Sequence, residues 1–488
     1  MDNLDEDSLF FGLKRGDIAA YEAVFKRYYK TLVVFLLVIN CVEPSIAQQA
    51  GSKGNHDRPN IIFLLTDDQR ADALGVMGNP IIQTPHLDAM AEAGYLFRNA
   101  YVTTSICAVS RASMLSGQYM SRHKIDDFST DFSESALANT YPMLLKKAGY
   151  HIGFIGKYGV GNQPPSDQFD FWSCWERGQP PYWLKNSAGE DVHHTDSVGH
   201  DIMRFLDEYG TEDAPFCLSV SFKAPHELDG DPPIYQVQER FRNLYTDVTI
   251  PPQPNGGANA WARTPPFFHD DKSIARKRWE GLFGSEEYYQ TNVKNYYRLI
   301  TGVDEVVGKL RDKLSALGID DRTVIIFMGD NGFCLGNHGL EGKWFGDEES
   351  VRVPLIVYDP SKSASTPGDV QPMALNIDVA PTILAYAGVP IPATMQGTNL
   401  RQTALNQKPT RSEFFYEHTF MGSPGIPKVE GVVGERYKYM IYTEHGYEEL
   451  FDLKRDPYEL SNVAADESYA QQLTQMRERY ESLKQAAQ

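Results

Sequence analysis

Two short polar segments of the chain each follow an apolar run and could hold a metal ion. Asp67 and Asp68 follow the run NIIFLLT, and Asp330 and Asn331 follow the run TVIIFM. Each pair by itself could equally be a helix cap or a strand-ending turn, because Asp and Asn favour both. Together they offer three carboxylates and one amide oxygen, a donor set that suits Ca²⁺, or alternatively Mg²⁺, rather than Zn²⁺.

A cysteine with Ser and Arg at fixed offsets is the second candidate for chemistry. In CAVSR, the residues are Cys107, Ser110 and Arg111. We expect a helix to begin at Ser110, which places Cys107 near a helix N-terminus, where backbone N–H groups and the helix dipole favour an anion. The guanidinium of Arg111 could bridge a nucleophile and the oxygens of an anion. A lone Cys is more often a small buried apolar residue. The interpretation of Cys107 as a chemical group therefore depends on the presence of Ser110 and Arg111.

The segment from Cys107 to Gly117, CAVSRASMLSG, resembles the signature of the type I sulfatases, Cys-x-Pro-Ser-Arg followed by x-x-x-Leu-Thr-Gly. In that family a maturation enzyme oxidises the Cys to formylglycine, whose hydrated form attacks the sulfur of a sulfate ester beside the metal. The resemblance implies that Cys107 is the nucleophile and also faces the metal, and that Arg111 is catalytic. It implies a formylglycine-generating or sulfatase-maturing enzyme as a partner. Val109 stands where the family has Pro or, less often, Ala, a position that matters to the maturation enzyme.

Three further segments resemble family landmarks that bind sulfate. Gly156-Lys157-Tyr158-Gly159 resembles Gly-Lys-Trp-His, which implies a sulfate contact for Lys157. The family His is replaced by Gly159, so one polar contact is missing or comes from elsewhere, with His123 as one candidate. Pro225-His226 resembles a strand-end Pro-His, which implies that His226 protonates the leaving oxygen or donates a hydrogen bond to it, tasks suited to an imidazole.

The third of these segments is HGLEGKW, which leads into EESVRVP. It resembles the family's His-Gly…Lys followed by Glu-Ser-x-Arg-Val-Pro. The resemblance implies that Lys343 binds a sulfate oxygen. It also implies that His338 lies at the rim of the active site, on the side of the metal or on the side of the substrate.

Apolar strands alternate with amphipathic helices from Arg58 onward, a pattern that predicts an α/β fold with a mostly parallel central sheet flanked by helices. We expect a catalytic domain over residues 48–405 and a smaller C-terminal α+β subdomain over 406–488. The resemblance runs from Arg58 to about Ala464 and implies the alkaline phosphatase-like fold. The least regular stretch, from His226 to Gln290, is interpreted as an insertion over the catalytic face. The expected helices are Pro85 to Ala93, Thr140 to Ala148, Tyr288 to Leu317 and Glu467 to Lys484.

The N-terminus combines two different segments. The apolar run from Thr31 to Ile39 is too short to span a bilayer, basic residues precede it, and Ser45-Ile46-Ala47 follows. Residues 26–47 therefore predict a signal peptide cleaved after Ala47, and export to the periplasm or beyond. Asn40 before Cys41 argues against a lipoprotein anchor, and no stable membrane span is expected. Residues 1–25 resemble the start of an extracytoplasmic-function sigma factor, which is explained most simply by a start codon assigned too far upstream or by a chimeric open reading frame.

The bulk composition limits the function classes. A formal net charge of −19 argues against nucleic-acid binding, so an anionic substrate needs cations concentrated in a cleft. The five cysteines fit neither a zinc pattern nor a disulfide scaffold, and we expect at most one disulfide among those remaining besides Cys41 and Cys107.

Sulfated carbohydrates of the ulvan, carrageenan or glycosaminoglycan type are the expected substrates. Two alternatives stay open, namely a phosphonate monoester or phosphodiester hydrolase of the same superfamily, and a non-catalytic glycan-binding protein. The residues that could contact substrate are His338, Arg177, His418, Lys185, His193, His194, Arg276, Lys277 and Arg278.

Overall fold

The first strand after the N-terminal segments lies inside an eight-stranded sheet. The computed structural model describes residues 58–175, 178–366 and 368–488, so the predictions for residues 1–47 lie outside the described residues. The strand order is β13-β2-β12-β9-β1-β8-β4-β5. All neighbouring pairs are parallel except those that β12 makes with β9 and β2. The predicted mostly parallel α/β sheet is therefore confirmed.

The elements that build this sheet and its cover have the following bounds. The strands are β1 (Asn60–Asp67), β2 (Tyr95–Phe97), β4 (His151–Lys157), β5 (Phe171–Trp175), β8 (Phe216–Pro225), β9 (Thr323–Gly329), β12 (Leu355–Tyr358) and β13 (Asp369–Val370). The main helices are α3 (Pro85–Ala93), α4 (Cys107–Ser116), α7 (Tyr141–Lys147), α8 (His194–Tyr209), α10 (Glu286–Ala316) and α12 (Val379–Tyr386).

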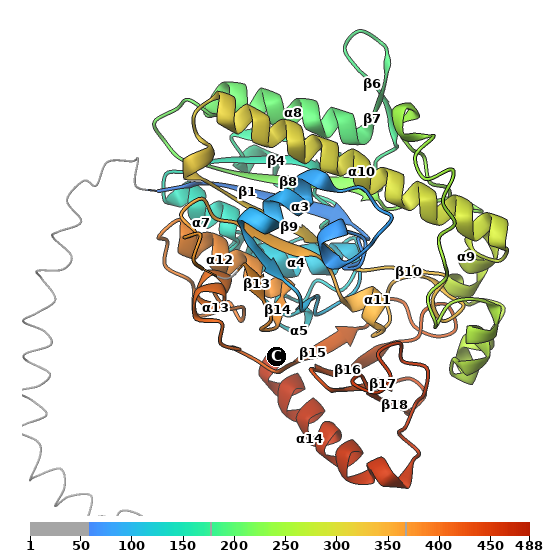
Figure 1. Ribbon diagram of the computed structural model, residues 1–488. Coiled ribbons are helices and arrows are strands. Elements are labelled where there is room, and N and C mark those ends of the chain that lie inside the picture. The colour runs from blue at the N-terminus through green and yellow to red at the C-terminus, as the bar shows by residue number, and fades with distance from the viewer. Residues whose placement is uncertain (1–57, 176–177, 367) are drawn as a thin grey trace, which may run out of the picture. The chain divides into compact units, whose positions relative to one another are not determined.

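Strand β1 is apolar from Ile61 to Leu65 because helices cover both faces of the sheet. Ile62 and Leu64 join one hydrophobic cluster, which α8 and α10 close. Ile61 and Phe63 join the opposite cluster, closed by α4, α7 and α12. Figure 1 shows α8 and α10 side by side along one face, with α4, α7 and α12 on the other.

The carboxyl ends of four parallel strands meet at one edge of the sheet. In the register of β1 with its neighbours, Thr66 lies beside Gly329 and Asp67 beside Pro225. Strand β4 pairs with β8 up to Gly156. Polar residues that follow β1, β9, β8 and β4 are thereby brought together, as expected for ligand sites in open α/β sheets.

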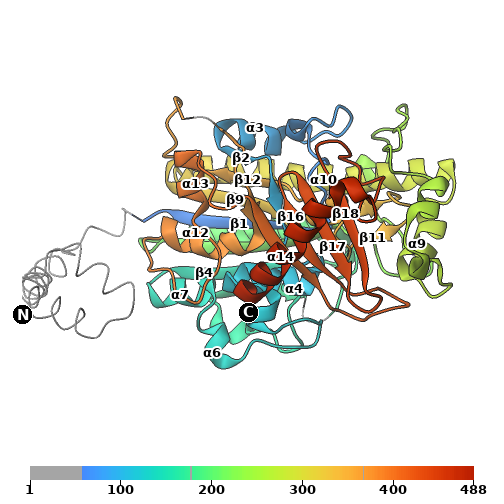
Figure 2. The same ribbon diagram turned by 90° about the horizontal axis from the view of Figure 1, so that it is seen from below.

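The C-terminal part forms a separate four-stranded antiparallel sheet. Its strands are β15 (Glu413–His418), β16 (Val429–Gly434), β17 (Tyr437–Tyr442) and β18 (Tyr447–Asp452). Helix α14 (Ala470–Ala487) packs Leu473, Met476 and Tyr480 against this sheet, and Figure 2 shows it lying across the strands. Arg58–Gln488 forms one compact unit, and a domain boundary near residue 405 stays a prediction.

Other findings concern helices, membrane spans and cysteines. Helix α4 begins at Cys107 itself, three residues earlier than predicted. Among the described residues, no helix combines the length and apolarity that crossing a bilayer requires. Cys107, Cys174, Cys217 and Cys334 are all free, so no disulfide forms among these four.

Candidate active site

Strand ends position most of the predicted chemical groups. Asp67 is the last residue of β1, Lys157 is the last residue of β4, and His226 directly follows β8. Asp330 and Asn331 follow β9. The backbone of Asp68 has a φ of 65°, a left-handed conformation that few non-glycine residues adopt and that is common at functional sites. These groups come from distant parts of the sequence and meet only because their strands are neighbours.

Helix α4 supplies the candidate nucleophile and one cation. Cys107 is its first residue and is only 1% exposed. Ile106 caps the helix without a side-chain hydrogen bond, which leaves the first-turn N–H groups available for an anion. Arg111 follows one turn later and is buried as well, so the helix directs both groups toward the strand ends.

Buried cations and carboxylates alternate around Cys107. Nε of Arg111 donates a hydrogen bond to Oδ2 of Asp330 at 2.9 Å, and Nη2 of Arg111 lies 2.8 Å from the same oxygen as an ion pair. The ammonium of Lys157 lies 2.5 Å from Oδ2 of Asp67, and that of Lys343 lies 2.5 Å from Oδ1 of Asp68. Nε2 of His226 lies 3.5 Å from Oδ2 of Asp68.

The protonation of these groups follows from burial and from their neighbours. Burial by itself raises the pKa of a carboxyl, but the surrounding cations, first Lys157, hold the pKa of Asp67 below its ordinary value. Burial raises the pKa of Asp68 well above its ordinary value, although Lys343 opposes the shift. Burial also raises the pKa of the Cys107 thiol. The unmodified thiol is therefore a weak nucleophile at neutral pH.

Three buried oxygens in this cluster indicate whether the residues present could hold a metal ion. Oδ1 of Asp67, Oδ2 of Asp68 and Oδ1 of Asn331 have no hydrogen-bond partner in the described part of the chain. Ligand atoms of Asp67, Cys107 and Asp330 lie within 4.8 Å of one another. Unpartnered buried oxygens are costly, and hard oxygen donors suit Ca²⁺. The residues fit a calcium ion held by the four predicted oxygen ligands, with Cys107 facing it.

Two of the departures from the family's pattern have a structural reason in this chain. A Cβ at Gly159 would lie 3.0 Å from Cδ of Arg111 and 3.4 Å from Cε of Lys157, and its φ is +72°. Gly159 therefore leaves room for the two cations. Val109 is fully buried in the apolar cluster with Ile106 and other residues, so it serves packing at that position.

His123, the candidate replacement for the missing family His, contacts Ser113 and Ile125. Nε2 of His123 lies 3.0 Å from Oγ of Ser113, and its Nδ1 accepts from the N–H of Ile125. Burial lowers the pKa of His123 to about 3. This imidazole is a neutral structural group rather than a contact to the nucleophile.

The structure does not bring the predicted substrate contacts into the cluster. His338 lies 3.5 Å from Oε2 of Glu349, and the carboxylates around it, first Asp347, raise its pKa to about 10 against the effect of burial. His418 is fully buried in β15, and neither ring nitrogen has a partner among the described residues. Arg177 lies outside the described residues.

Four of the other candidate cations have structural partners, whereas Nδ1 of His194 is buried without a hydrogen-bond partner among the described residues. Lys185 pairs with Asp191 at 2.8 Å, His193 caps α8, and Arg276 stacks on Trp279 with Cζ 4.0 Å from the ring centroid. Arg278 lies 3.0 Å from Glu227 and 3.1 Å from Asp229.

Sequence reasoning missed three residues that contact the cluster. Ser221 accepts a hydrogen bond from Nη1 of Arg111, and the carboxylate of Glu227 lies 3.6 Å from Nδ1 of His226. Both belong to or adjoin the strand-end motif that contains His226, so their position could have drawn attention to them. The side-chain amide of Gln179 lies 3.1 Å from Nε2 of His226. It comes from an irregular segment without any sequence signal.

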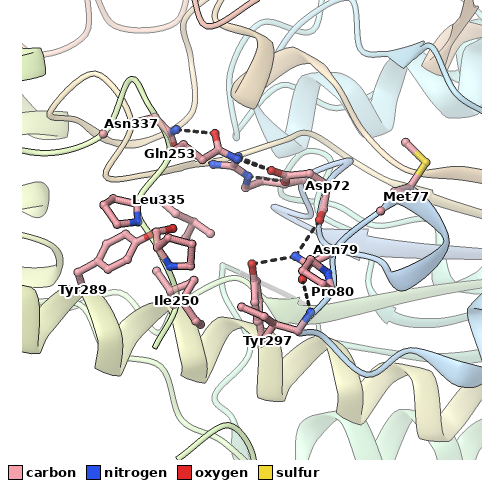
Figure 3. Close-up of a pocket in the computed structure, with 17 residues that line it drawn as sticks. Asp72, Met77, Asn79, Pro80, Ile250, Gln253, Tyr289, Tyr297, Leu335 and Asn337 are labelled. Carbon is pink, nitrogen blue, oxygen red and sulfur yellow. Dashed lines mark hydrogen bonds and ion pairs between the residues drawn. The ribbon is translucent and has the colours of Figure 1, made fainter. Parts of the chain in front are cut away.

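A separate cavity of about 280 Å³ lies between the segment after Asp68 and helix α10. Figure 3 shows that Asp72 and Asn79 on one side and Gln253 and Tyr297 on the other bond to one another. None of the predicted catalytic or metal-binding residues lines it. Every buried side-chain nitrogen and oxygen along this cavity has a hydrogen-bond partner within the described chain.

The fold and the site together define a hydrolase of the alkaline phosphatase-like class, with a nucleophile, buried cations and hard oxygen ligands at the strand ends of a mostly parallel sheet. The chain belongs to the sulfatase family and is therefore a sulfuric ester hydrolase, because the family described as Sulfatase matches residues 59–389. A second family, described as N-sulphoglucosamine sulphohydrolase, C-terminal, matches residues 336–486.

Known relatives cover nearly the whole chain. An N-acetylglucosamine-6-O-sulfatase of Bacteroides thetaiotaomicron is 26% identical over 92% of this chain and 89% of its own length. A protein solved in complex with its substrate D-glucosamine-2-N,6-O-disulfate is 26% identical, with a TM-score of 0.74 over 88% of this chain and 98% of that one. The phosphonate monoester hydrolase of Agrobacterium radiobacter is 22% identical, with a TM-score of 0.74 over 88% and 96%.

Proposed function

We propose that this sulfatase removes sulfate from a sulfated saccharide of the glycosaminoglycan type, with Cys107, after oxidation to formylglycine, as the nucleophile. The observation that carries the proposal is the alternation of Arg111, Lys157 and Lys343 with buried carboxylates around the first residue of α4. Three cations at this spot offset the charge of a sulfate that a protein of net charge −19 would otherwise repel. The relatives that act on glucosamine sulfates support the saccharide class.

Each side chain then has a distinct task. The oxidised Cys107 provides the attacking oxygen. Asp67, Asp68, Asp330 and Asn331 would hold a Ca²⁺, which would supply positive charge to the site. Lys157 and Lys343 bind sulfate oxygens and stabilise the charge that builds up on them. Arg111 holds the nucleophile and the sulfate in line through its fixed fork of donors.

We assign to His226 the role of donating a proton to the leaving oxygen. Burial, together with Lys343, lowers the pKa of His226 well below its ordinary value. The negative charge of bound sulfate favours the protonated imidazole, so the proton is taken up with the substrate. Nδ1 lies 2.6 Å from the backbone oxygen of Glu227, a contact that holds the ring with Nε2 toward the site.

The proposed function is tested by comparing ester classes. We expect the protein from a host with a formylglycine-generating enzyme to release sulfate from glucosamine-6-sulfate and related saccharides, with a kcat/KM well above that for a matched phosphonate monoester. The comparison with phosphonate is needed because the phosphonate monoester hydrolase shares the fold at the same TM-score. A preference for the phosphonate ester would contradict the proposal and favour the alternative.

Removal of the metal gives a second prediction. Chelation with EDTA should abolish sulfate release, and added Ca²⁺ should restore it, because Asp67, Asp68 and Asn331 each have a buried oxygen without a hydrogen-bond partner among the described residues. Calcium should also raise the melting temperature, since it binds only the folded chain. Steady-state turnover and thermal unfolding measure the two effects, with Zn²⁺ as the comparison ion. Turnover that is indifferent to chelation would contradict the metal site.

Export is proposed on the N-terminal sequence alone. The signal peptide predicted at residues 26–47 would deliver the enzyme to the periplasm or outside the cell, where polymeric sulfated carbohydrates are met. N-terminal sequencing of the mature protein tests the cleavage after Ala47.

A further inference from the structure

The segment from Gly178 to Tyr182, between β5 and β6 (Trp183–Lys185), is fixed to the end of β8. The hydroxyl of Tyr182 donates to the backbone oxygen of His226 at 2.5 Å. The ammonium of Lys223 donates to the backbone oxygen of Pro180 and lies 4.8 Å from the centroid of the Tyr182 ring. Tyr182 and Lys223 are both fully buried, so these anchors hold the segment against the strand that presents His226.

This anchoring places the side-chain amide of Gln179 beside the leaving-group side of the site. Nε2 of Gln179 lies 3.1 Å from Nε2 of His226. This ring nitrogen is the one that we propose donates a proton to the leaving oxygen. Oε1 of Gln179 is buried and accepts no hydrogen bond from the described residues. A buried amide oxygen without a partner is costly, and it suits a donor such as the hydroxyl of a sugar.

An exposed tryptophan lies on the same edge of the sheet. Trp175 ends β5 and is the register partner of Lys157 in β4, so it is next to a residue that contacts the catalytic cluster. Its side chain is 41% exposed, although indole is a large apolar surface that folding normally covers. Four residues span at most about 14 Å, so Trp175 and Gln179 lie within reach of one saccharide.

We infer that Trp175 and Gln179 form the subsite for the pyranose ring whose oxygen leaves when sulfate is removed. The inference rests on the proposed function and deepens it, since it names the residues that select a sugar over a simple aryl ester. Trp175 stacks on the apolar face of the ring, and Oε1 of Gln179 accepts a hydrogen bond from a hydroxyl near the scissile ester. An aryl sulfate has no such hydroxyl and leaves Oε1 unsatisfied.

The test compares two substrates in two variants. We expect Gln179→Ala and Trp175→Ala each to lower the ratio of kcat/KM for glucosamine-6-sulfate to kcat/KM for 4-nitrophenyl sulfate by about ten-fold or more. Most of the loss should appear in the KM of the saccharide. The matched controls are Gln163→Ala, an exposed glutamine, and Trp183→Ala, which is also 41% exposed but packs edge-on against His193 at 5.3 Å. Both controls should keep the ratio of the parent enzyme.

Two outcomes would overturn the subsite. An equal loss of kcat/KM on both substrates would show that Gln179 merely positions His226, and an unchanged kcat/KM on both substrates would show that the sugar lies elsewhere. Calorimetric binding of the sulfated saccharide in a Cys107→Ala background adds a readout without turnover, in which Trp175→Ala should weaken binding about ten-fold. If the parent enzyme released no sulfate from any ester, the proposed function would fail, and this binding measurement would still decide the subsite.

Discussion

Replacing Cys107 by alanine is expected to abolish sulfate release, with a loss on the order of 10³-fold or more, because the nucleophile is removed while the cations stay. The side chain lies at the first position of α4 and is enclosed by buried ion pairs. Loss of one sulfur atom there leaves those ion pairs intact, so the melting temperature should change little. Sulfate release and thermal unfolding of the same preparations measure both effects.

The control for this variant is Cys174→Ala, a half-buried free cysteine in β5. It should keep the turnover of the parent enzyme. Mass spectrometry of the peptide that contains Cys107 provides the second readout, because oxidation to formylglycine exchanges a thiol for an aldehyde oxygen and lowers the mass. Retained turnover in Cys107→Ala would exclude this residue as the nucleophile. Active parent enzyme without the mass shift would exclude formylglycine.

Replacing Asp330 by asparagine should lower turnover on the order of 10²-fold or more. It should also lower the free energy of unfolding of the calcium-free protein by about 3–5 kcal/mol, the usual cost of breaking a buried ion pair. Oδ2 of Asp330 binds Arg111 at 2.8 and 2.9 Å, and Oδ1 accepts from the N–H of Asp68 at 3.0 Å. The neutral amide leaves Arg111 as a buried charge with a weaker partner.

Asp369→Asn is the matched control, because Asp369 pairs with Arg98 at 2.8 Å but is 57% exposed. Exposed pairs contribute about 0–1 kcal/mol, so this variant should be close to the parent in both measurements. Chemical denaturation with and without Ca²⁺ separates the ion pair from the metal. Stability and turnover equal to those of the Asp369 variant would contradict the role of Asp330.

Local patterns were sufficient for much of the fold. Pro85–Ala93 has the predicted bounds, and α10 differs from its prediction only near its ends. These segments have clear apolar periodicity and clear terminating residues, which depend on neighbours in sequence. Helix α8 was not predicted, although Val198, Ile202 and Phe205 lie on its buried face. Polar residues and a glycine interrupt that stripe, and only packing against β8 and α10 settles it.

The start of α4 shows where local reasoning fails. The sequence places its beginning at Ser110, yet the helix begins at Cys107 without a side-chain cap. The surrounding chain holds this end in place, since the N–H of Trp344 donates to the backbone oxygen of Ser105 at 3.1 Å. A helix end that is stabilised by contacts from more than 200 residues away carries no local signal, although this end is the one that presents the nucleophile.

The sequence by itself determined which residues are candidates for the chemistry, namely the nucleophile, its cations and four oxygen ligands. These residues could be recognised because they stand at the ends of predicted strands or near the start of a predicted helix, in a recognisable order along the chain. The tertiary structure decided which of them meet. The register of β1 with β8 and β9 brings Asp67, Asp330 and His226 together, whereas His338 and His418 are held elsewhere by carboxylates and by burial. It also decided that Gln179 reaches His226, since hydrogen bonds between distant segments fix that loop and no local pattern encodes them.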